Sequence, residues 1–472
     1  MSSRPPSETD GLARVLAVGL SAFVVLAPWP FGGTTRPGGT ALELAALALA
    51  AAWAVRGLRR GADLPPRPLV LGMLGLLVLG AVQVLPLGSA VSAAISPASE
   101  RIRAETRAPE RARAAEAALL GADPESLDRP ATLSVDPAAT AAALRTGAAA
   151  AALLLVATTV GATGGARWVA AGLLAGAAFQ GLYGLLVLVS GYDHIWHVPK
   201  THNLDAATGT FVNKNHFACL VAMSLGCGLG AILERPRAPG PPSPRRVVRW
   251  LGPEGSRRLL LGVLLASGLA GLLASFSRAG IALGLIGLTL VALAARDGPG
   301  LRVRAVTLVV LGAAAALPLG EVGIERLIDR YRESGEELET GRAVVWEDTA
   351  RMALAFPLVG SGFGTFATVY PLFRSPEVRR FYQHAHNDGL QVAAEGGVAG
   401  VVLVAVLLAT LAAHLVPALA GRKGALGAGI AAGLLVFLLH ALVDFNAHIP
   451  ANLDVAAVLA GLLVGLPWAS DR

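Results

Sequence analysis

The chain has 472 residues, of which 54% are hydrophobic and only 15% are charged, and its mean hydropathy is +0.60. Ala, Leu, Val and Gly occur in long uninterrupted blocks, which is typical of an integral membrane protein and excludes an ordinary water-soluble enzyme. The formal net charge is +7, but most basic residues lie in short segments between apolar runs. Membrane topology explains that placement, so the charge does not indicate a nucleic-acid partner.

An apolar helix needs about 20 residues to cross a bilayer, and the chain contains about twelve suitable runs. In chain order they lie at 12–29, 40–57, 68–89, 138–160, 166–190, 214–233, 258–274, 279–296, 303–320, 387–415, 425–446 and 452–468. The first is interpreted as a span rather than a cleaved signal peptide, because it lacks a small-x-small exit and ends in Pro28-Trp29-Pro30. The sequence therefore predicts an all-α integral membrane protein with about 12 transmembrane helices, forming a single polytopic domain over 1–472.

Basic residues fall after alternate runs, and this pattern sets the orientation. They are Arg4 and Arg14; Arg56, Arg59, Arg60 and Arg67; Arg167; the arginines of 235–258; Arg296, Arg302 and Arg304; and Arg422 with Lys423. With twelve spans all six groups face one side, which the positive-inside rule identifies as the cytoplasm. Two longer loops, 90–137 and 321–386, then face outward, where long loops translocate largely regardless of charge. The first, with interleaved arginines and glutamates, predicts a solvated or surface-lying helix, and the second predicts amphipathic helices.

Polar side chains gather on the predicted outer face. Eight of the nine histidines lie in outward loops or at outer helix ends, and only His414 lies near the cytoplasm. A transporter more often places its polar sites near the bilayer midplane, on broken and repeated helices. Transport is therefore the weaker interpretation, although it remains the rival one. Cys219 and Cys227 are too far apart along one predicted helix for a disulfide and are interpreted as core residues.

The segment Gln383-His384-Ala385-His386-Asn387-Asp388 precedes a long apolar run and is the most informative in the chain. Asn387 or Asp388 is a suitable N-cap for the helix that follows, and Gln391 completes a pattern like a capping box. His386 then lies just before a helix N-terminus, whose partial positive charge favours the neutral imidazole. A neutral imidazole at the water interface is a competent general base, a role that contributes roughly 10²- to 10⁴-fold to a rate.

Two features of this region allow a structural alternative. His386 and Asn387 can simply cap a helix at the headgroup level. Glu395 shares a helical face with Asp388 and Gln391 and lies about 10 Å into the span. An intramembrane carboxylate is costly, so Glu395 should face protein or water. We place Glu395 and His384 with the substrate-binding candidates, while Glu395 as a packing polar group stays open.

Two arginines are candidates for binding an anionic group. Arg278 closes a four-residue break between two apolar runs, so it is held at an outer hairpin or a broken helix. Arg342 begins a predicted amphipathic helix. The stripe expected to face the core or the membrane is Val345, Trp346, Thr349, Met352 and Ala353. A guanidinium fork binds phosphate oxygens bidentately. The alternative for both arginines is snorkelling to lipid headgroups.

The segment 209–216 leads into the sixth run. Its Lys214, Asn215 and His216 suit hydrogen bonds to sugar hydroxyls or phosphate, and they equally suit capping of the helix. The glycine-rich segment 360–364 lacks the strand, Lys and Ser/Thr of a phosphate loop and is interpreted as a turn. The histidine pairs show no carboxylate–histidine helix motif, and residues two apart diverge on a helix, so no metal site is predicted.

Taken in order, these motifs resemble those of the O-antigen ligase and polymerase family of bacterial inner-membrane glycosyltransferases, over roughly 200–450. The motifs are Gly209 to His216, Ser277-Arg278, Gly341-Arg342 with Trp346, Pro357 to Phe366, and His386-Asn387. The family's ligases carry His-Asn/Ser/Gln, nine residues, Gly, two residues, then Gly, Thr or Tyr. Here His386-Asn387, Gly397 and Gly400 fit that spacing fully.

The resemblance implies an enzyme that takes a glycan from undecaprenyl diphosphate on the periplasmic face of the inner membrane, without metal, nucleotide sugar or other cofactor. His386 would deprotonate the acceptor hydroxyl, and Arg278 and Arg342 would hold the departing diphosphate. A single displacement would invert the anomeric carbon. The motifs do not separate a ligase, whose acceptor is lipid A-core, from a polymerase, whose acceptor is another lipid-linked glycan. A polysaccharide exporter or lipid flippase is the non-enzymatic alternative.

Overall fold

The computed structural model describes residues 10–106, 118–119, 131–234, 253–295 and 341–468. The contacts between residues divide the chain into two compact units. The first, unit 1, is Met1–Arg67, Ala149–Glu333 and Ala409–Arg472, and the second, unit 2, is Pro68–Ala148 and Ser334–Leu408. Nearly all regular structure is helical, apart from a short hairpin of β1 (His194–Ile195) and β2 (Val198–Pro199).

Eleven of the twelve predicted runs fall on helices. These are α1 (Gly11–Leu26), α2 (Arg36–Arg60), α3 (Arg67–Val84), α7 (Pro137–Ala162), α8 (Ala166–Ser190), α9 (Lys214–Leu233), α11 (Pro253–Ala274), α12 (Arg278–Ala294), α16 (Asp388–Leu419), α17 (Gly424–His440) and α18 (Pro450–Gly465). The run at 303–320 lies outside the described residues. Within the described part, six helices are long and apolar enough to span a bilayer and five apolar helices are shorter. The all-α membrane fold is confirmed, and the count of twelve spans stays a prediction.

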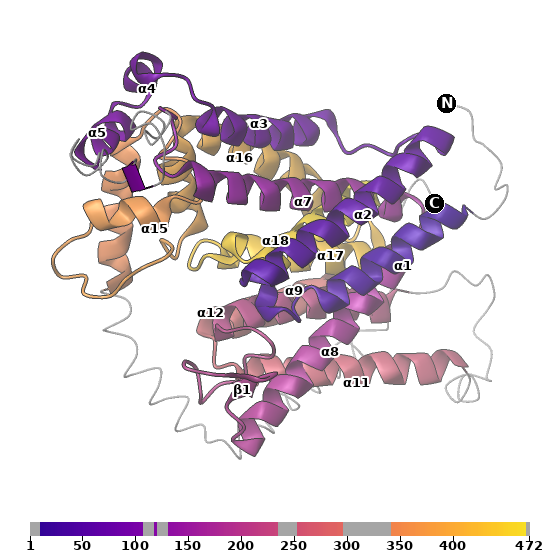
Figure 1. Cartoon of the computed structure of the whole chain (residues 1–472). Coiled ribbons are helices and arrows are strands. Elements are labelled where there is room, and N and C mark those ends of the chain that lie inside the picture. The colour runs from indigo at the N-terminus through magenta and orange to yellow at the C-terminus, as the bar shows by residue number, and fades with distance from the viewer. Residues whose placement is uncertain (1–9, 107–117, 120–130, 235–252, 296–340, 469–472) are drawn as a thin grey trace. The chain divides into compact units, whose positions relative to one another are not determined.

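Unit 1 is built around α9, which packs against α8, α11, α12 and α17 (Figure 1). The residues that line this bundle are almost all apolar. The charged groups at the ends of its helices therefore need specific partners within the protein. Glu234 accepts the backbone N–H of Leu426 at the start of α17, at 2.9 Å. The buried ammonium of Lys423 donates to the carbonyls of Leu463 and Leu466, each at 2.7 Å, at the end of α18. Both contacts satisfy groups that helix termini leave unpaired and match the sign of the helix dipole.

Unit 2 contains α3, the early turns of α7 and α16, and several short helices. The short helices are α4 (Ser89–Ile95), α5 (Pro97–Thr106), a helix over 341–355, α15 (Phe366–Val369) and η3 (Tyr370–Leu372). Val345, Thr349 and Met352 are buried, and Trp346 and Ala353 are half-buried, so of the two orientations open for this stripe the structure favours the one toward the core. In the loop 90–137 the described residues include α5 and nearly all of α4, and most of 107–130 lies outside the described residues.

Candidate functional site

Asn387 caps the long helix α16 in unit 2. Its side-chain oxygen accepts the backbone N–H of Leu390 at 3.0 Å, and its carbonyl accepts the N–H of Gln391 at 3.0 Å. Of the two N-cap candidates in the sequence, Asn387 therefore fills the position, and the helix begins at Asp388. This places His386 immediately before the helix N-terminus, as expected.

His386 adopts a left-handed backbone conformation, with φ of 54°. Such a conformation is uncommon for a residue with a side chain, and it persists where neighbouring contacts enforce it. The preceding residue, Ala385, is fully buried and held on both sides. Its N–H donates to the side-chain oxygen of Gln391 at 3.0 Å, and its carbonyl accepts from the Trp346 indole at 3.0 Å. The half-buried imidazole meets the ring of Tyr382 edge-on, with centroids 5.8 Å apart.

Gln391 joins the histidine segment to the body of α16. Its side-chain nitrogen lies 3.2 Å from Nδ1 of His384 and 3.1 Å from a carboxylate oxygen of Glu395. With the bond from Ala385, one buried amide thus connects three parts of the site. The sequence predicts a capping-box role for Gln391. In the structure, its side chain instead contacts His384 and accepts the N–H of Ala385.

We expect Gln391→Ala to destabilise unit 2 by about 1–3 kcal/mol, because it leaves the buried N–H of Ala385 without its acceptor. The measurement is thermal unfolding of the purified protein, together with hydrogen exchange of the peptide over 384–387. Gln383→Ala is the matched control, since Gln383 is exposed and lies five residues before the first residue of the helix, Asp388. Equal unfolding temperatures and equal exchange for both variants would contradict the clamping role of Gln391.

Glu395 is 2% exposed and faces protein, as predicted for an intramembrane carboxylate. One carboxylate oxygen accepts the N–H of Gly364 at 2.8 Å, and the other accepts the N–H of Phe366 at 2.9 Å. Through these bonds Glu395 anchors the segment 360–366. This supports the alternative that Glu395 is a packing polar group. Contact of Glu395 with substrate stays a prediction.

The turn 357–364 fits into a break in α16. The helix is interrupted at Gly397, where φ is 60° and ψ is −161°, and the N–H groups of Val398 and Ala399 donate to the carbonyls of Pro357 and Leu358 at 2.8 and 3.1 Å. A Cβ atom at Gly397 would lie 2.6 Å from the Leu358 carbonyl. The predicted turn is confirmed. The motif requires glycine at this position because the backbones of α16 and of the turn touch there.

Gln83, on α3, supports the same junction and was missed by sequence reasoning. Its fully buried side-chain nitrogen donates to the carbonyls of Val359 and Glu395, at 2.6 and 2.9 Å, and its oxygen accepts the N–H of Phe363 at 3.1 Å. The available signal was a lone amide within an otherwise apolar run, since a buried amide requires partners.

Arg342 lies in the first turn of the helix over 341–355, beside the histidine segment. A Cβ atom built on its neighbour Gly341 would lie 3.5 Å from the Tyr382 hydroxyl, and the ring of Tyr382 contacts His386. Tyr382 thus brings the Arg342 and His386 motifs together within unit 2, and no sequence signal pointed to this tyrosine.

A buried carboxylate, Asp348, holds Tyr370, the aromatic neighbour of Tyr382. Asp348 accepts hydrogen bonds from the Tyr370 hydroxyl at 3.0 Å and from the N–H of Ser375 at 2.9 Å, and it pairs with Arg351. Tyr370 in turn meets Tyr382 edge-on, with centroids 6.4 Å apart. Burial, together with the hydrogen bond to Asp348, raises the pKa of Tyr370 above its usual range, so this tyrosine acts as a neutral donor.

Unit 1 contains the second group of candidates, at the start of α9. The helix is capped by Asn213, which accepts the N–H of Asn215 at 2.9 Å. The Asn215 side chain donates to Asp444 at 2.8 Å. Nδ1 of the buried His216 lies 3.1 Å from the side-chain oxygen of Asn446. Asn215 and His216 therefore bind the segment after α17, which favours a structural role for both.

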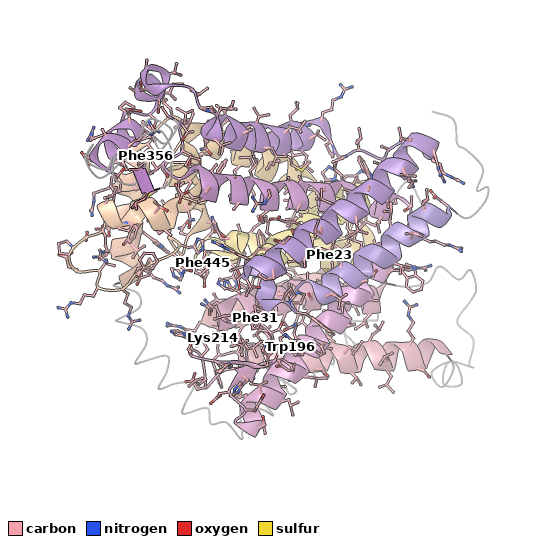
Figure 2. All side chains as sticks on the ribbon, viewed as in Figure 1. Phe23, Phe31, Trp196, Lys214, Phe356 and Phe445 are labelled. Atoms are coloured by element: carbon pink, nitrogen blue, oxygen red, sulfur yellow. The ribbon has the colours of Figure 1, made fainter. Side chains whose placement is uncertain are left out.

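Lys214 and Arg278 come together in the same unit. Arg278 is the first residue of α12, after the N-cap Ser277, which accepts the N–H of Gly280 at 3.3 Å. The break between α11 and α12 confirms the predicted interruption. The helices α9 and α12 pack together, and the N–H of Ala207 donates to the carbonyl of Ala274 at 2.8 Å, so the segments that lead to these two half-buried cations are neighbours. Such a pair is suited to an anionic ligand. Figure 2 labels Lys214 together with Phe445, whose ring contacts His216 edge-on at 4.5 Å.

The Asp444, Asn446 and Asn452 partners were missed by sequence reasoning. Asn452 donates to Asn446 at 2.9 Å and to the carbonyl of His216 at 3.0 Å. Their signal was the same as for Gln83, namely polar side chains at the edges of apolar runs. In the part of the chain that the structure describes, no three His, Cys, Asp or Glu side chains form a metal-ligand group.

Comparison with known families gives one match. A family model described as O-antigen ligase matches residues 261–405. This region includes Arg278, Arg342, His386 and the glycine motif, and the resemblance drawn from these motifs is confirmed there. Lys214, Asn215 and His216 precede the matched region. No curated protein matches the chain.

Proposed function

From the O-antigen ligase region over 261–405, which indicates cell-surface polysaccharide biosynthesis in a multi-pass membrane protein, we propose the following activity. The protein transfers a glycan from undecaprenyl diphosphate to a hydroxyl acceptor at the periplasmic face of the bacterial inner membrane. The acceptor is lipid A-core in the ligase version of this reaction. It is a second lipid-linked glycan in the polymerase version.

The observation that carries the proposal is the fixed position of His386. Its backbone is held in the left-handed conformation by bonds to Ala385 on one side and by the Asn387 cap on the other. A residue that only capped the helix would not need this arrangement, because Asn387 already supplies the cap. Strained backbone held by many contacts is characteristic of functional residues.

In the proposed reaction a ring nitrogen of His386 takes the proton of the acceptor hydroxyl. The hydroxyl oxygen forms a bond to the anomeric carbon of the donor glycan, and the bond between that carbon and the diphosphate oxygen breaks. The electron pair leaves with undecaprenyl diphosphate, and the anomeric configuration inverts in this single displacement. No metal ion enters the scheme, and the proton remains on His386 until solvent removes it.

Negative charge develops on the departing diphosphate, so preorganised cations accelerate this step. Arg342 is assigned to this role because its neighbour Gly341 lies beside the hydroxyl of Tyr382, whose ring contacts His386 in unit 2. The pair Lys214 and Arg278 belongs to unit 1, and its assignment to the same diphosphate is part of the proposal. His384 is assigned to the acceptor side, where Gln391 orients its ring.

The test is glycan transfer by the purified protein in detergent with EDTA present. Lipid A-core and a lipid-linked glycan are offered separately as acceptors to an undecaprenyl-diphosphate glycan donor. Product on lipid A-core alone identifies a ligase, and a ladder on the lipid-linked acceptor identifies a polymerase. A folded protein that gives neither product, but moves the donor lipid across proteoliposome membranes, is a transporter and refutes the proposal.

A further inference from the structure

An aromatic groove lies at the end of α8 in unit 1. It has a volume of about 410 Å³ and is lined by Tyr183, Leu186, Val187, Ser190, Tyr192 and Trp196. This volume is in the range of small-molecule sites. None of these residues has a role in the proposed transfer reaction.

The groove walls are fixed by internal contacts. The N–H of Trp196 donates to the Tyr183 hydroxyl at 2.7 Å, and its indole N–H donates to the carbonyl of Trp29 at 2.9 Å. The rings of Tyr183 and Trp196 lie 5.0 Å apart, and Phe179 stacks on both Trp29 and Tyr183. Trp196 adopts a positive φ of 56° at the tip of the β1–β2 hairpin. The rings therefore form one wall that is held together by internal contacts, rather than separate side chains at the membrane surface.

Most polar atoms of this wall are used within the protein. Ser190 donates to the carbonyl of Val187 and accepts the N–H of Tyr192, both at 3.3 Å. Both N–H groups of Trp196 donate as described above, and the Tyr183 oxygen accepts one of them. Apart from the hydroxyl groups of Tyr183 and Tyr192, the wall presents aliphatic and ring carbon. A sugar is recognised through hydrogen bonds at placed polar groups, whereas a hydrocarbon chain needs only apolar walls. The groove chemistry therefore favours a hydrocarbon.

The groove lies on the exposed face of α8, a helix that is long and apolar enough to span the bilayer. Leu182, Leu186 and Val189 are 53%, 66% and 82% exposed along this face. Such an apolar, exposed surface on a helix of this length is suited to contact with lipid. A chain in the bilayer thus has direct access to the groove.

The same end of unit 1 holds the Lys214 and Arg278 cations. Gln180, one turn before Tyr183, exchanges hydrogen bonds with Thr210 at 2.8 and 2.9 Å, and Thr210 precedes Lys214 by four residues, a reach of at most about 14 Å. The N–H of Ala207 bonds to the carbonyl of Ala274, four residues before Arg278, at 2.8 Å. Figure 2 shows Lys214 and Trp196 at this end of the unit. A lipid with an anionic head on the two cations has its chain beside the groove.

The geometry points to this groove as the binding site for the head-proximal part of the isoprenoid chain of the diphosphate-linked donor. The inference rests on the proposed function and adds the surface that holds the donor's tail. Its consequence is that donor affinity depends on chain length through Leu186 and its neighbours, separately from the diphosphate contacts.

The test is photocrosslinking in nanodiscs of bacterial phospholipids. The probe is a C55 isoprenyl diphosphate that carries a diazirine in an isoprene unit close to the head, and adducts are mapped by mass spectrometry. We expect adducts on the peptide over 182–196, with about tenfold fewer in Leu186→Trp, which fills the groove mouth. That change corresponds to the burial of roughly two methylene groups. Leu182→Trp, on the same face but outside the lining, is the matched control and should label like the wild type.

Two results would overturn the groove assignment. One is the absence of adducts on 182–196 in the wild type. The other is equal labelling by a diazirine phosphatidylcholine, without competition by unlabelled C55 isoprenyl diphosphate, which identifies an ordinary lipid-facing surface. Glycan transfer is measured on the same preparation. Adducts without transfer refute the proposed function alone, and transfer without adducts refutes the groove assignment alone.

Discussion

His386→Asn is expected to lower the kcat for glycan transfer by roughly 10²- to 10⁴-fold, which is the contribution of a general base. Asparagine is the informative replacement because it tolerates the left-handed backbone that this position requires. It keeps the local fold and hydrogen-bonding capacity but cannot accept a proton at neutral pH. The KM for the donor should change little, since the diphosphate is assigned to the cations. The measurement is steady-state transfer with the undecaprenyl-diphosphate glycan.

Two controls separate catalysis from folding in that experiment. Gln383→Ala, in the same segment but exposed, should retain wild-type turnover. The thermal unfolding temperature of His386→Asn should match that of the wild type, whereas His386→Ala is expected to be somewhat less stable. Wild-type turnover in His386→Asn would show that His386 is not the general base and that its segment has only the structural role left open from the sequence.

The fold class was predictable from sequence because apolar runs and helix signals are local. The apolar run after Asn387, the polar break before Arg278 and the helical spacing of apolar residues near Arg342 are each visible within a short stretch of sequence. A cap at Asn387 or Asp388 followed from residue type and position, and the structure selects Asn387. The number of spans was less secure, because length and hydropathy leave several shorter helices undecided.

The contacts that build the site were not predictable in the same way. Gln83 bonds to the carbonyl of Glu395, 312 positions later in the chain. A single sequence shows that each is a polar residue in an apolar run, but it does not show that they meet. The same limit applies to Asn215 with Asp444, and to Glu395 itself, whose backbone N–H partners fall in a turn about 30 residues before it. A polar residue at a buried position indicates that a hydrogen-bond partner exists. Only the three-dimensional structure identifies that partner.

The glycine at the α16 break should be a highly sensitive non-catalytic position. Gly397→Ala is expected to destabilise the protein by about 2–4 kcal/mol, through both backbone strain and overpacking. The backbone there is nearly exclusive to glycine, and the new Cβ would meet the Leu358 carbonyl at 2.6 Å and the N–H nitrogen of Gly360 at 2.7 Å. These are main-chain atoms, so no flexible side chain can move away. Glycan transfer should fall with stability, because the same turn anchors Glu395 and, through Gln391, the His386 segment.

Gly400→Ala is the matched control for this prediction. Gly400 lies three residues further along the same motif, and a Cβ atom there would meet nothing nearer than 3.6 Å. That space agrees with the family pattern, which accepts Thr or Tyr at this position but only Gly at the other. The measurement is thermal unfolding in detergent, where Gly397→Ala should unfold on the order of 10 °C lower and Gly400→Ala near the wild type. Similar unfolding temperatures for the two variants would mean that the turn yields at Gly397, and that the motif glycine is required for another reason, such as direct access of substrate to the backbone.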